Sequence, residues 1–483
     1  MPLGRKRDTR ARQKPEWQST ARHRGGPARS SDEGPVMGLE PRSGADQGQP
    51  EANPQGEEPR ERPKPKVKSF DIPKRLVYEA WEKVRDNKGA PGVDAVSIAV
   101  FASDERDNLY KLWNRMASGS YFPGPVRAVE IPKDHGAGVR VLGVPNTADR
   151  VAQTAVKALL EEKLEPIFHP DSYGYRPGRS AHDALAVARE RCWKRDWALD
   201  LDIRAFFDSV PHDLLLKAVA HHTDERWVLL YIERWLKAPM QMPDGTLVAR
   251  DKGTPQGSPI SPLLANLFMH YAFDRWMGRE FPGCQFERYA DDILAHCNTE
   301  EQARHLRAAI ADRLGALGLE LHPDKTKVVY CKDGQRRGNS EHTCFDFLGY
   351  TFRARLAKGK RGFFVNFSPA MSAKAKKAKG LQIRAWHLNR RSGTDLSSIA
   401  KEVNPQVRGW INYYGAFYRS AVYSLALRID QHLVRWAMQK FKRLKRRPDR
   451  AWALLDDVRK RAPKLFAHWY LLPRTTGRPA RAG

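Results

Sequence analysis

Acidic residues at a predicted strand end and a predicted hairpin turn constrain this chain more than any other feature. Residues 197–203 alternate apolar side chains with Asp200 and Asp202, which is the pattern of a strand with two carboxylates on one face. Later in the chain, Asp291 and Asp292 lie between two short apolar runs, and therefore at the turn of a predicted hairpin. Adjacent carboxylates repel each other, so this turn favours a bound cation. In isolation, such a pair would be interpreted as ordinary turn acids.

Asp202, Asp291 and Asp292 are the candidate catalytic and metal-binding residues, and they come from two predicted elements. Carboxylate oxygens suit a hard cation such as Mg²⁺. Two such ions about 3.5–4 Å apart can stabilise the attacking and the leaving oxygens of an in-line phosphoryl displacement. The pattern therefore indicates phosphoryl transfer with two Mg²⁺ ions.

The charge balance of the chain favours a polyanionic partner. Among its 483 residues, 84 are Lys or Arg and 56 are Asp or Glu, which gives a formal net charge of +28. Lys and Arg that bind phosphates release counterions, so nucleic acid is the expected partner. Apolar residues make up 41% of the chain, which is enough for a sizeable core.

Several classes of protein are disfavoured by the sequence. No run approaches 18 consecutive apolar residues, so we expect no membrane span. The five cysteines include no Cys-x-x-Cys pair, which argues against a disulfide scaffold or a zinc finger. They fit a reducing compartment such as the cytoplasm, and the N-terminal segment lacks the apolar core of a secretory signal.

Composition and periodicity divide the chain into three parts. Residues 1–68 are rich in Gly, Pro and Arg and are expected to be a disordered basic tail. Residues 69–355 mix helical and strand periodicities, including a helix from Asn146 or Thr147 onwards and a short strand at 345–352. Past about residue 365 the strand patterns stop, and residues 365–475 are expected to form a separate domain of basic helices.

Three motifs, in this order, resemble those of reverse transcriptases. Residues 202–208 resemble the first carboxylate motif in its group II intron form, and residues 253–266 resemble the glycine- and proline-rich motif that follows it. Residues 289–292 are similar to the Tyr-x-Asp-Asp box. By these motifs the chain is identified as a member of the bacterial group II intron-encoded reverse transcriptase/maturase family.

Other segments extend the resemblance over most of the chain. Residues 87–98, 129–145 and 172–185 look like the fingers of group II enzymes, and residues 404–418 resemble their maturase, or X, domain. Many relatives carry a C-terminal HNH endonuclease region with paired cysteines, whereas no cysteine follows Cys344 here. We therefore expect the form of the protein that lacks this region.

The resemblance implies an α+β right-hand polymerase, with fingers and a palm built on an antiparallel sheet, followed by an α-helical thumb/maturase domain. It implies that Asp202, Asp291 and Asp292 bind two Mg²⁺ ions, with Ile203 as a further metal ligand. The expected activity is RNA-directed DNA synthesis, with binding of intron RNA to assist splicing and mobility. The implied partners are group II intron RNA, an RNA template with a DNA primer, dNTPs and target DNA, in the bacterial cytoplasm and away from membranes.

Five residues match family positions around the incoming nucleotide. Lys133 and Arg140 match cations that grip the triphosphate, where arginine adds bidentate geometry. Phe207 matches the bulky residue that excludes a ribose 2′-hydroxyl, and strand alternation assigns it, rather than Phe206, to the site. Gln256 matches a residue near the sugar and template, and Lys325 one that assists the departure of pyrophosphate. The alternatives are solvated cations, a core phenylalanine and a turn-stabilising amide.

Basic residues of the C-terminal helices are the candidate contacts to RNA. These are Lys374, Lys376, Lys377, Lys379, Lys442, Arg443, Lys445, Arg446 and Arg447. Charge runs are also common on solvated helix faces, so a solvated surface without RNA contact remains the alternative. The aromatic residues at helical spacing from Trp410 to Tyr418 are more typical of core packing.

Two other functions remain open on the sequence. A group II-like reverse transcriptase could act in phage defence or at a CRISPR locus, and the catalytic motifs do not distinguish that role. A non-catalytic RNA-binding splicing factor would fit the basic helices, but such proteins tend to lose the acids that this chain retains.

Overall fold

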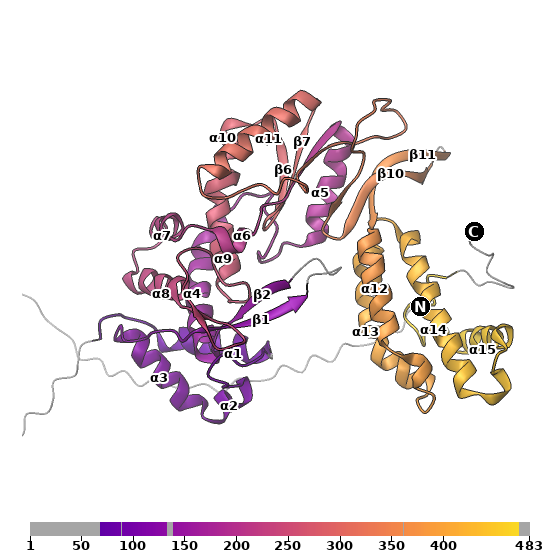
Figure 1. Ribbon diagram of the computed structural model, residues 1–483, viewed down its shortest axis with the longest axis horizontal. Coiled ribbons are helices and arrows are strands. Elements are labelled where there is room, and N and C mark those ends of the chain that lie inside the picture. Colours follow the sequence, from indigo (N-terminus) through magenta and orange to yellow (C-terminus); the bar gives the residue numbers. More distant parts are fainter. Residues whose placement is uncertain (1–67, 88, 133–138, 361, 473–483) are drawn as a thin grey trace, which may run out of the picture. The chain divides into compact units, whose positions relative to one another are not determined.

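The computed structural model describes residues 68–87, 89–132, 139–360 and 362–472, which belong to one compact unit. The predicted tail at 1–68 lies outside the described residues, apart from residue 68. Within the described residues, helices and strands mix up to Met371 and only helices follow (Figure 1). All five cysteines are free thiols. No helix among these residues is both long and apolar enough to cross a membrane.

The first part of the described chain packs helices beside a small sheet with the strand order β2-β1-β4-β5. Its helices are α1 (Lys74–Asp86), α2 (Ile98–Ser103), α3 (Glu105–Ala117) and α4 (Thr147–Leu164). Its strands are β1 (Val126–Pro132), β2 (Val139–Val144), β4 (Met240–Gln241) and β5 (Leu247–Val248). The predicted helix start is confirmed, because α4 begins at Thr147 with Asn146 as its N-cap residue.

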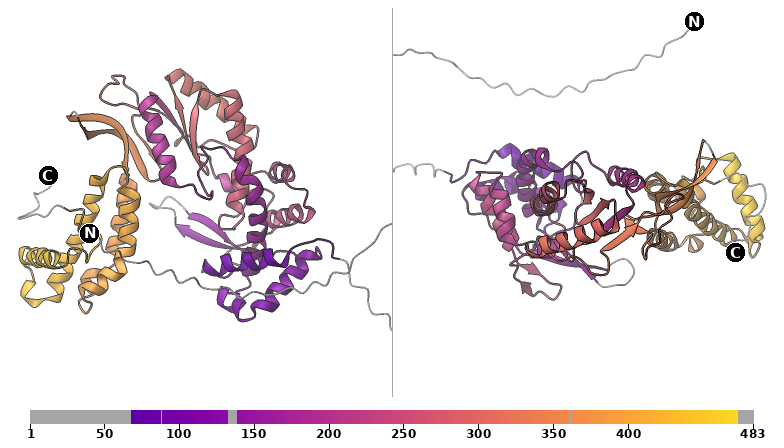
Figure 2. Two further views of the ribbon diagram at one scale, coloured as in Figure 1. Left: turned by 180° about the vertical axis from the view of Figure 1, so that it is seen from behind. Right: turned by 90° about the horizontal axis from the view of Figure 1, so that it is seen from above.

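A second sheet, called here the central sheet, has the strand order β6-β7-β3-β8 and is antiparallel throughout. Its strands are β3 (Trp197–Leu201), β6 (Gln285–Tyr289), β7 (Asp292–Cys297) and β8 (Lys327–Tyr330). The helices α5 (Ala181–Lys194) and α11 (Glu300–Gly315) pack against it, as Figure 1 shows and Figure 2 repeats from behind. The predicted strand near 197–203 and the predicted hairpin around Asp291 are both confirmed.

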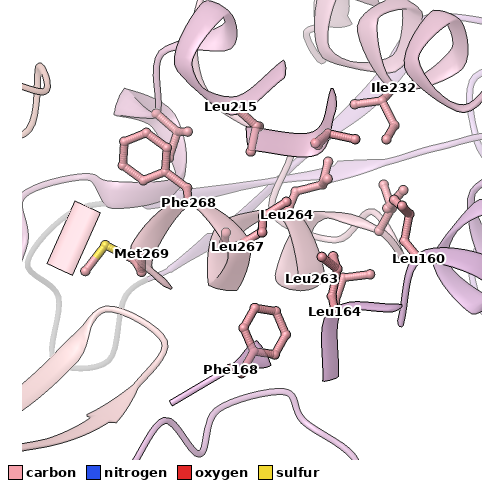
Figure 3. Packing of buried hydrophobic residues seen from close by; sticks show 14 of the residues in the cluster. Leu160, Leu164, Phe168, Leu215, Ile232, Leu263, Leu264, Leu267, Phe268 and Met269 are labelled. Carbon is pink, nitrogen blue, oxygen red and sulfur yellow. The ribbon is translucent and has the colours of Figure 1, made fainter. Parts of the chain in front are cut away.

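The helices that lie between β3 and β6 in the chain contribute to the main apolar core. They are α6 (Phe206–Ser209), α7 (His212–Ala220), α8 (Arg226–Lys237), α9 (Ser261–Met269), a π-helical turn at His270–Asp274, and α10 (Arg275–Glu280). Figure 3 shows Leu263, Leu264 and Leu267 of α9 packing between α4 and α7. Truncating one such buried leucine to alanine costs ~2–5 kcal/mol in other proteins, so this cluster holds α9 firmly.

A third sheet, β11-β10-β9, follows the central one and differs from the sequence-based expectation. Its strands are β9 (Phe345–Phe347), β10 (Tyr350–Gly359) and β11 (Gly362–Met371). Residues 345–352 are not one strand, because Leu348 and Gly349 adopt positive φ values of 49° and 78° and reverse the chain between β9 and β10. The expectation that strands stop near residue 365 is also wrong, since β11 continues to Met371 by pairing along the whole length of β10.

The helical region, residues 373–472, has a hydrophobic core of its own. Its helices are α12 (Ala373–Ala385), α13 (Leu396–Tyr414), α14 (Tyr423–Lys440) and α15 (Pro448–Arg461), with 3₁₀ turns at Leu388–Arg390, Arg419–Val422 and Lys442–Leu444. Tyr413 attaches this region to the β9–β10 turn, because its hydroxyl donates to the Leu348 carbonyl at 2.8 Å. The backbone carbonyl of Tyr413 accepts a hydrogen bond from the Tyr350 hydroxyl. The aromatic stripe therefore packs as expected, at the core and at this junction.

Candidate active site

Pairing of β3 with β7 brings the predicted acids together. Leu201 pairs with Ile293, so the next residue along β3, Asp202, lies opposite Asp292. Tyr289 pairs with Asp292 across a turn of only two residues, Ala290 and Asp291. Because directly opposed residues in an antiparallel pair are close neighbours, the three candidate acids share one end of the central sheet.

Desolvation, together with the crowding of the acids, raises the pKa values of several of these carboxyl groups. Although the Asp292 side chain opens to solvent, desolvation by the surrounding protein and then the charges of Asp291 and Asp202 raise its pKa to about 7. Desolvation also raises the pKa of Asp291. Burial, with the charges of Asp292 and Asp202, raises the pKa of Asp200 to about 8. The ionised set is therefore unfavourable on its own, which is the electrostatic condition that a bound cation relieves.

A protein cation already neutralises one of these acids. The ammonium of Lys325 lies 2.9 Å from Oδ2 of Asp202, and neither side chain is fully buried. Among the residues that the structure describes, no three His, Cys, Asp or Glu side chains are arranged closely enough to form a ready-made metal site. The carboxylate oxygens of Asp202, Asp291 and Asp292 nevertheless fit a divalent cation in their chemistry.

Ile203 could bind a metal only through its backbone carbonyl, since its side chain is apolar and buried. The backbone on either side of it is held in place: the Arg204 amide donates to the Glu320 carbonyl and the His322 amide donates to the Asp202 carbonyl, both at 2.8 Å. These bonds hold the chain immediately after β3 in one position, which fixes where the Asp202 side chain starts.

The hairpin turn that carries Asp291 packs tightly against the segment that contains Gly174. Ala290 has a positive φ of 60°, a conformation that costs a non-glycine residue free energy. Gly174 lies directly against it, and a Cβ at that position would come within 2.5 Å of the Ala290 amide nitrogen. The Gly174 carbonyl accepts a hydrogen bond of 2.6 Å from the Asn266 amide of α9. The turn is therefore supported by a segment that only glycine allows to approach so closely.

Arg288 is the main residue that the sequence analysis missed. It is fully buried, and its guanidinium makes a bidentate ion pair with Asp274, at 2.7 and 2.6 Å, within the π-helical turn. Its Nη1 also donates to Asn266 Oδ1 at 2.9 Å and to the Ala290 carbonyl at 3.2 Å. One buried cation thus ties α9, the π-helical turn and the Asp291 hairpin together. The sequence signal that could have revealed it is a charged residue within a predicted strand, three positions before the acidic pair.

Glu287, the preceding residue of β6, belongs to a second buried network on the opposite face of the strand. Its carboxylate lies 2.7 Å from Nε2 of His296 and 2.5 Å from Arg191 of α5, and Arg191 also pairs with Asp171 at 2.8 Å. Both Glu287 and His296 are fully buried. The β6–β7 hairpin is therefore held by paired charges on both faces.

Only one of the two predicted triphosphate-binding cations is described. Lys133 lies outside the described residues. Arg140 is exposed on β2. Desolvation raises the pKa values of Asp291 and Tyr175, and the charge of Arg140 opposes this rise, which places it near the acidic turn. The structure thus brings Arg140 to the same site as the acids.

Phe206 and Phe207 have different surroundings, but for another reason than the one expected. Strand alternation does not apply, because Ala205 has a positive φ of 46° and starts the short helix α6. Phe206 is 2% exposed within the main core, whereas Phe207 is only half-buried. The assignment of Phe207 to the accessible side therefore remains, although the reason given for it is wrong.

The loop at residues 253–257 forms hydrogen bonds with both α6 and β2. The Thr254 amide donates to the Phe207 carbonyl at 2.7 Å, and the Gly143 amide donates to the Gln256 carbonyl at 2.7 Å. A Cβ on Gly253 would lie 2.8 Å from the Phe207 carbonyl oxygen. Gln256 is therefore held between the first sheet and the segment that carries Phe207.

The candidate RNA-binding cations occupy two places in the helical region. Desolvation raises the pKa of Asp292, and the charge of Lys374, at the start of α12, opposes this rise, so Lys374 lies near the acids. Lys376, Lys377 and Lys379 follow it on the same helix. The other five are all exposed in the turn between α14 and α15: Lys442, Arg443, Lys445, Arg446 and Arg447.

Two successive segments of this chain match known protein families. Residues 131–352 match the family "Reverse transcriptase (RNA-dependent DNA polymerase)", and residues 376–454 match "Group II intron, maturase-specific domain". Protein YkfC of Escherichia coli (strain K12) is 32% identical over 313 residues, which cover 57% of this chain and 79% of that protein. The group II intron-encoded protein LtrA of Lactococcus lactis is 31% identical over 195 residues, or 40% of this chain, but these span only 32% of LtrA.

Among solved structures, a telomerase from Candida albicans in complex with a fragment of telomeric RNA aligns with 77% of this chain and 67% of its own. Its sequence identity is 13% and its TM-score is 0.42. The two family matches, the similarity to most of YkfC and the acids at one end of an antiparallel sheet agree with one another. This chain belongs to the group II intron-encoded reverse transcriptase/maturase family.

Proposed function

We propose that this protein copies RNA into DNA and binds a group II intron RNA to assist its splicing and mobility. The observation that carries the proposal is the register of β3 against β7, which places Asp202 opposite Asp292 and beside the Asp291 turn. The chain would act in the bacterial cytoplasm on an RNA template with a DNA primer, dNTPs and target DNA. The first sheet, the central sheet and the helical region would be its fingers, palm and thumb.

Asp202, Asp291 and Asp292 would hold two Mg²⁺ ions, with the Ile203 carbonyl as a further ligand. When bound, the ions would lower the pKa of the primer 3′-hydroxyl and neutralise charge that develops on the phosphate. The protein's own part is to keep the carboxylates in position before the substrate arrives, and the Arg288 network does this for the turn. Lys325 would leave Asp202 when the metals bind and would face the departing pyrophosphate.

Three other side chains would position the nucleotide. Arg140, with Lys133, would bind the triphosphate, and Phe207 would exclude a ribose 2′-hydroxyl by steric contact. Gln256, held between β2 and α6 by its backbone, would lie near the sugar and the template base. These assignments rest on the family positions together with the placement of Arg140 near Asp291.

Primer extension on an RNA template tests the proposal. The purified protein should add dNTPs to a DNA primer in the presence of Mg²⁺, and Asp202→Asn or Asp291→Asn should lower the rate by several orders of magnitude. The matched control is Asp312→Asn, an exposed acid in the last turn of α11 that is outside the cluster. Template binding should be unchanged in all three variants. Normal extension by either cluster variant would contradict the metal assignment.

The maturase role is tested separately by intron RNA. The match of residues 376–454 to the maturase-specific domain favours this role over phage defence. An intron transcribed from the DNA that flanks the gene should splice faster with the protein present, and Asp291→Asn should retain this effect because splicing assistance needs binding rather than polymerisation. Failure of the wild-type protein to bind or assist that RNA would favour the other roles.

A further inference from the structure

A groove between α12 and α13 combines aromatic, amide and cationic side chains on the surface of the helical region. It has a volume of about 460 Å³. It is lined by Lys379, Gln382, Ala385, Trp386, Gln406 and Trp410. Pockets that bind small planar ligands have volumes of roughly 300–1,000 Å³, so this groove has room for one nucleobase.

Helical spacing places these residues side by side. On α12, Lys379, Gln382 and Trp386 follow one another at intervals of three and four residues, just before and after the end of the helix at Ala385. On α13, Gln406 and Trp410 are four residues apart and face the same groove. Two helices thus contribute one indole and one amide each, and α12 adds the cation.

The two indoles form an offset parallel stack, with Trp386 as the more exposed ring. The ring planes of Trp386 and Trp410 are inclined by only 2°, with centroids 5.7 Å apart, within the range of an offset stack. Trp410 is 8% exposed and belongs to the core, while Trp386 is half-buried and extends the surface outwards. The ammonium of Lys379 lies 5.6 Å from the Trp410 ring centroid. The aromatic surface therefore has a fixed orientation and a positive charge at its edge.

The two glutamines offer hydrogen-bonding groups that the described part of the protein does not use. Both Gln382 and Gln406 are exposed, and within the described residues neither amide has a hydrogen-bond partner. A flat aromatic face, two free amides and one cation match the three parts of a nucleotide: the face of the base, its polar edge, and its phosphate. An acidic or an apolar peptide would leave the stacked indoles or the amides without a matching group.

We infer that this groove binds one unstacked nucleobase of the RNA, held by stacking on the indole of Trp386, which the parallel ring of Trp410 supports. The inference rests on the proposed function, since it takes RNA as the partner. Lys374 lies in the first turn of helix α12, and Trp386 lies twelve residues further on, or about 18 Å at 1.5 Å per residue. The groove is therefore at the opposite end of α12 from Lys374.

Binding of two synthetic 12-residue oligomers to the full chain tests the inference: oligoadenylate, and an abasic ribose-phosphate of the same charge. Trp386→Leu should weaken oligoadenylate binding by about fivefold to a hundredfold, with no change in its salt dependence. Abasic oligomer binding should stay the same, because it has no base to stack. Lys379→Gln should instead make the salt dependence of log K shallower by about 0.7.

The matched control is Trp452→Leu, a half-buried tryptophan on α15 that packs on the same core but is outside the groove. It should leave oligoadenylate binding unchanged, and melting temperatures of both variants should show that they fold. An equal loss in Trp452→Leu, an equal loss for the abasic oligomer, or no loss in Trp386→Leu would overturn the inference.

Extension of a short, saturating primer–template by Trp386→Leu should remain normal, so failure of the polymerase proposal would show separately, in the wild-type protein. Equal effects on oligodeoxyadenylate would show that the groove does not select RNA.

Discussion

The central sheet and the turn between α14 and α15 use charge in opposite ways. Around the central sheet, Arg288 and Asp274 are fully buried and paired with each other, and so are Glu287 and His296. In the helical region, the five cations at residues 442–447 are exposed, and none of them belongs to an ion pair within the described residues. Buried pairs fix geometry at a high desolvation cost, whereas exposed cations remain free to meet a polyanion.

This contrast separates two tasks within one chain. Phosphoryl transfer requires carboxylates held within a fraction of an ångström, so the hairpin that carries Asp291 is fixed by hydrogen bonds that water cannot replace. Binding a long RNA requires many contacts of modest strength, each of which can be made by a mobile side chain. The following predictions test whether stability depends on the first set and RNA affinity on the second.

The largest effect is expected from Arg288→Met. This change leaves Asp274 buried without its partner, which costs ~3–5 kcal/mol of unfolding free energy by comparison with other buried pairs. Urea unfolding measures the loss, and primer extension should fail as well, because the Ala290 turn loses its donor.

The control for this variant is Arg204→Met. Arg204 and Glu320 form an ion pair in which both side chains are 64% exposed, and such pairs contribute ~0–1 kcal/mol. The double variant Arg288→Met/Asp274→Leu should recover much of the lost stability but not the activity. A cost below about 1 kcal/mol for Arg288→Met would remove the contrast between the two regions.

Neutralising the five cations at 442–447 to glutamine should change RNA binding and leave stability nearly unchanged. If each contacts one phosphate, the slope of log K against log salt should become shallower by about 3.5, at about 0.7 per contact with single-stranded RNA. Filter binding of intron RNA between 50 and 200 mM salt measures it. The same change at Arg279, Arg304 and Arg307, exposed on α10 and α11, serves as the control. An unchanged slope would mean that the five charges only solvate the helical region.

Asp149 provides a pH-dependent test of buried charge. It is 4% exposed in α4, accepts a hydrogen bond of 2.5 Å from the Tyr121 hydroxyl, and burial raises its pKa from 3.8 to about 6. The folded state therefore holds a proton that the unfolded state releases. As pH rises from about 4 to 6, this group should lower the free energy of unfolding, by at most ~3 kcal/mol, and it should have no further effect above pH 6.

Comparison with Asp149→Asn isolates this contribution, because the amide does not titrate. The difference in unfolding free energy between the variant and the wild-type protein should grow in favour of the variant from pH 4 to pH 6. Urea unfolding at pH 4.5 and pH 6.5 measures it. The same difference at both values would show that Asp149 titrates normally.

The smallest effect is expected from Phe207→Val. A smaller side chain should admit a ribose 2′-hydroxyl and reduce the preference for dNTPs over rNTPs by roughly tenfold, within the ~1–3 kcal/mol that a steric contact can discriminate. Phe206→Val, in the core, should lower the melting temperature and leave sugar selection unchanged. Single-nucleotide incorporation distinguishes them, and a selectivity change only in Phe206→Val would exchange the two roles.

Local patterns in the sequence were sufficient to predict most of the elements at the site. Alternation at 197–203 and the two apolar runs around Asp291 determine β3, β6 and β7, because strand periodicity is a property of neighbouring residues. The helix at Thr147 begins where its capping residue predicts. The prediction failed at 345–352, where a turn that depends on Leu348 and Gly349 divides one apolar run into two strands. It failed again near residue 365, where β11 continues because β10 provides a partner along its whole length.

The sequence by itself therefore predicted which acids would come together, on which elements they would lie, and that a polyanion would be the partner. Only the tertiary structure decided what holds these acids and which side chains meet on the surface of the helical region. Arg288 meets Asp274 fourteen residues away, and Trp386 meets Trp410 through the packing of α12 against α13. Such contacts leave no periodic signal in the chain, because they depend on how whole elements pack rather than on the conformation of neighbouring residues.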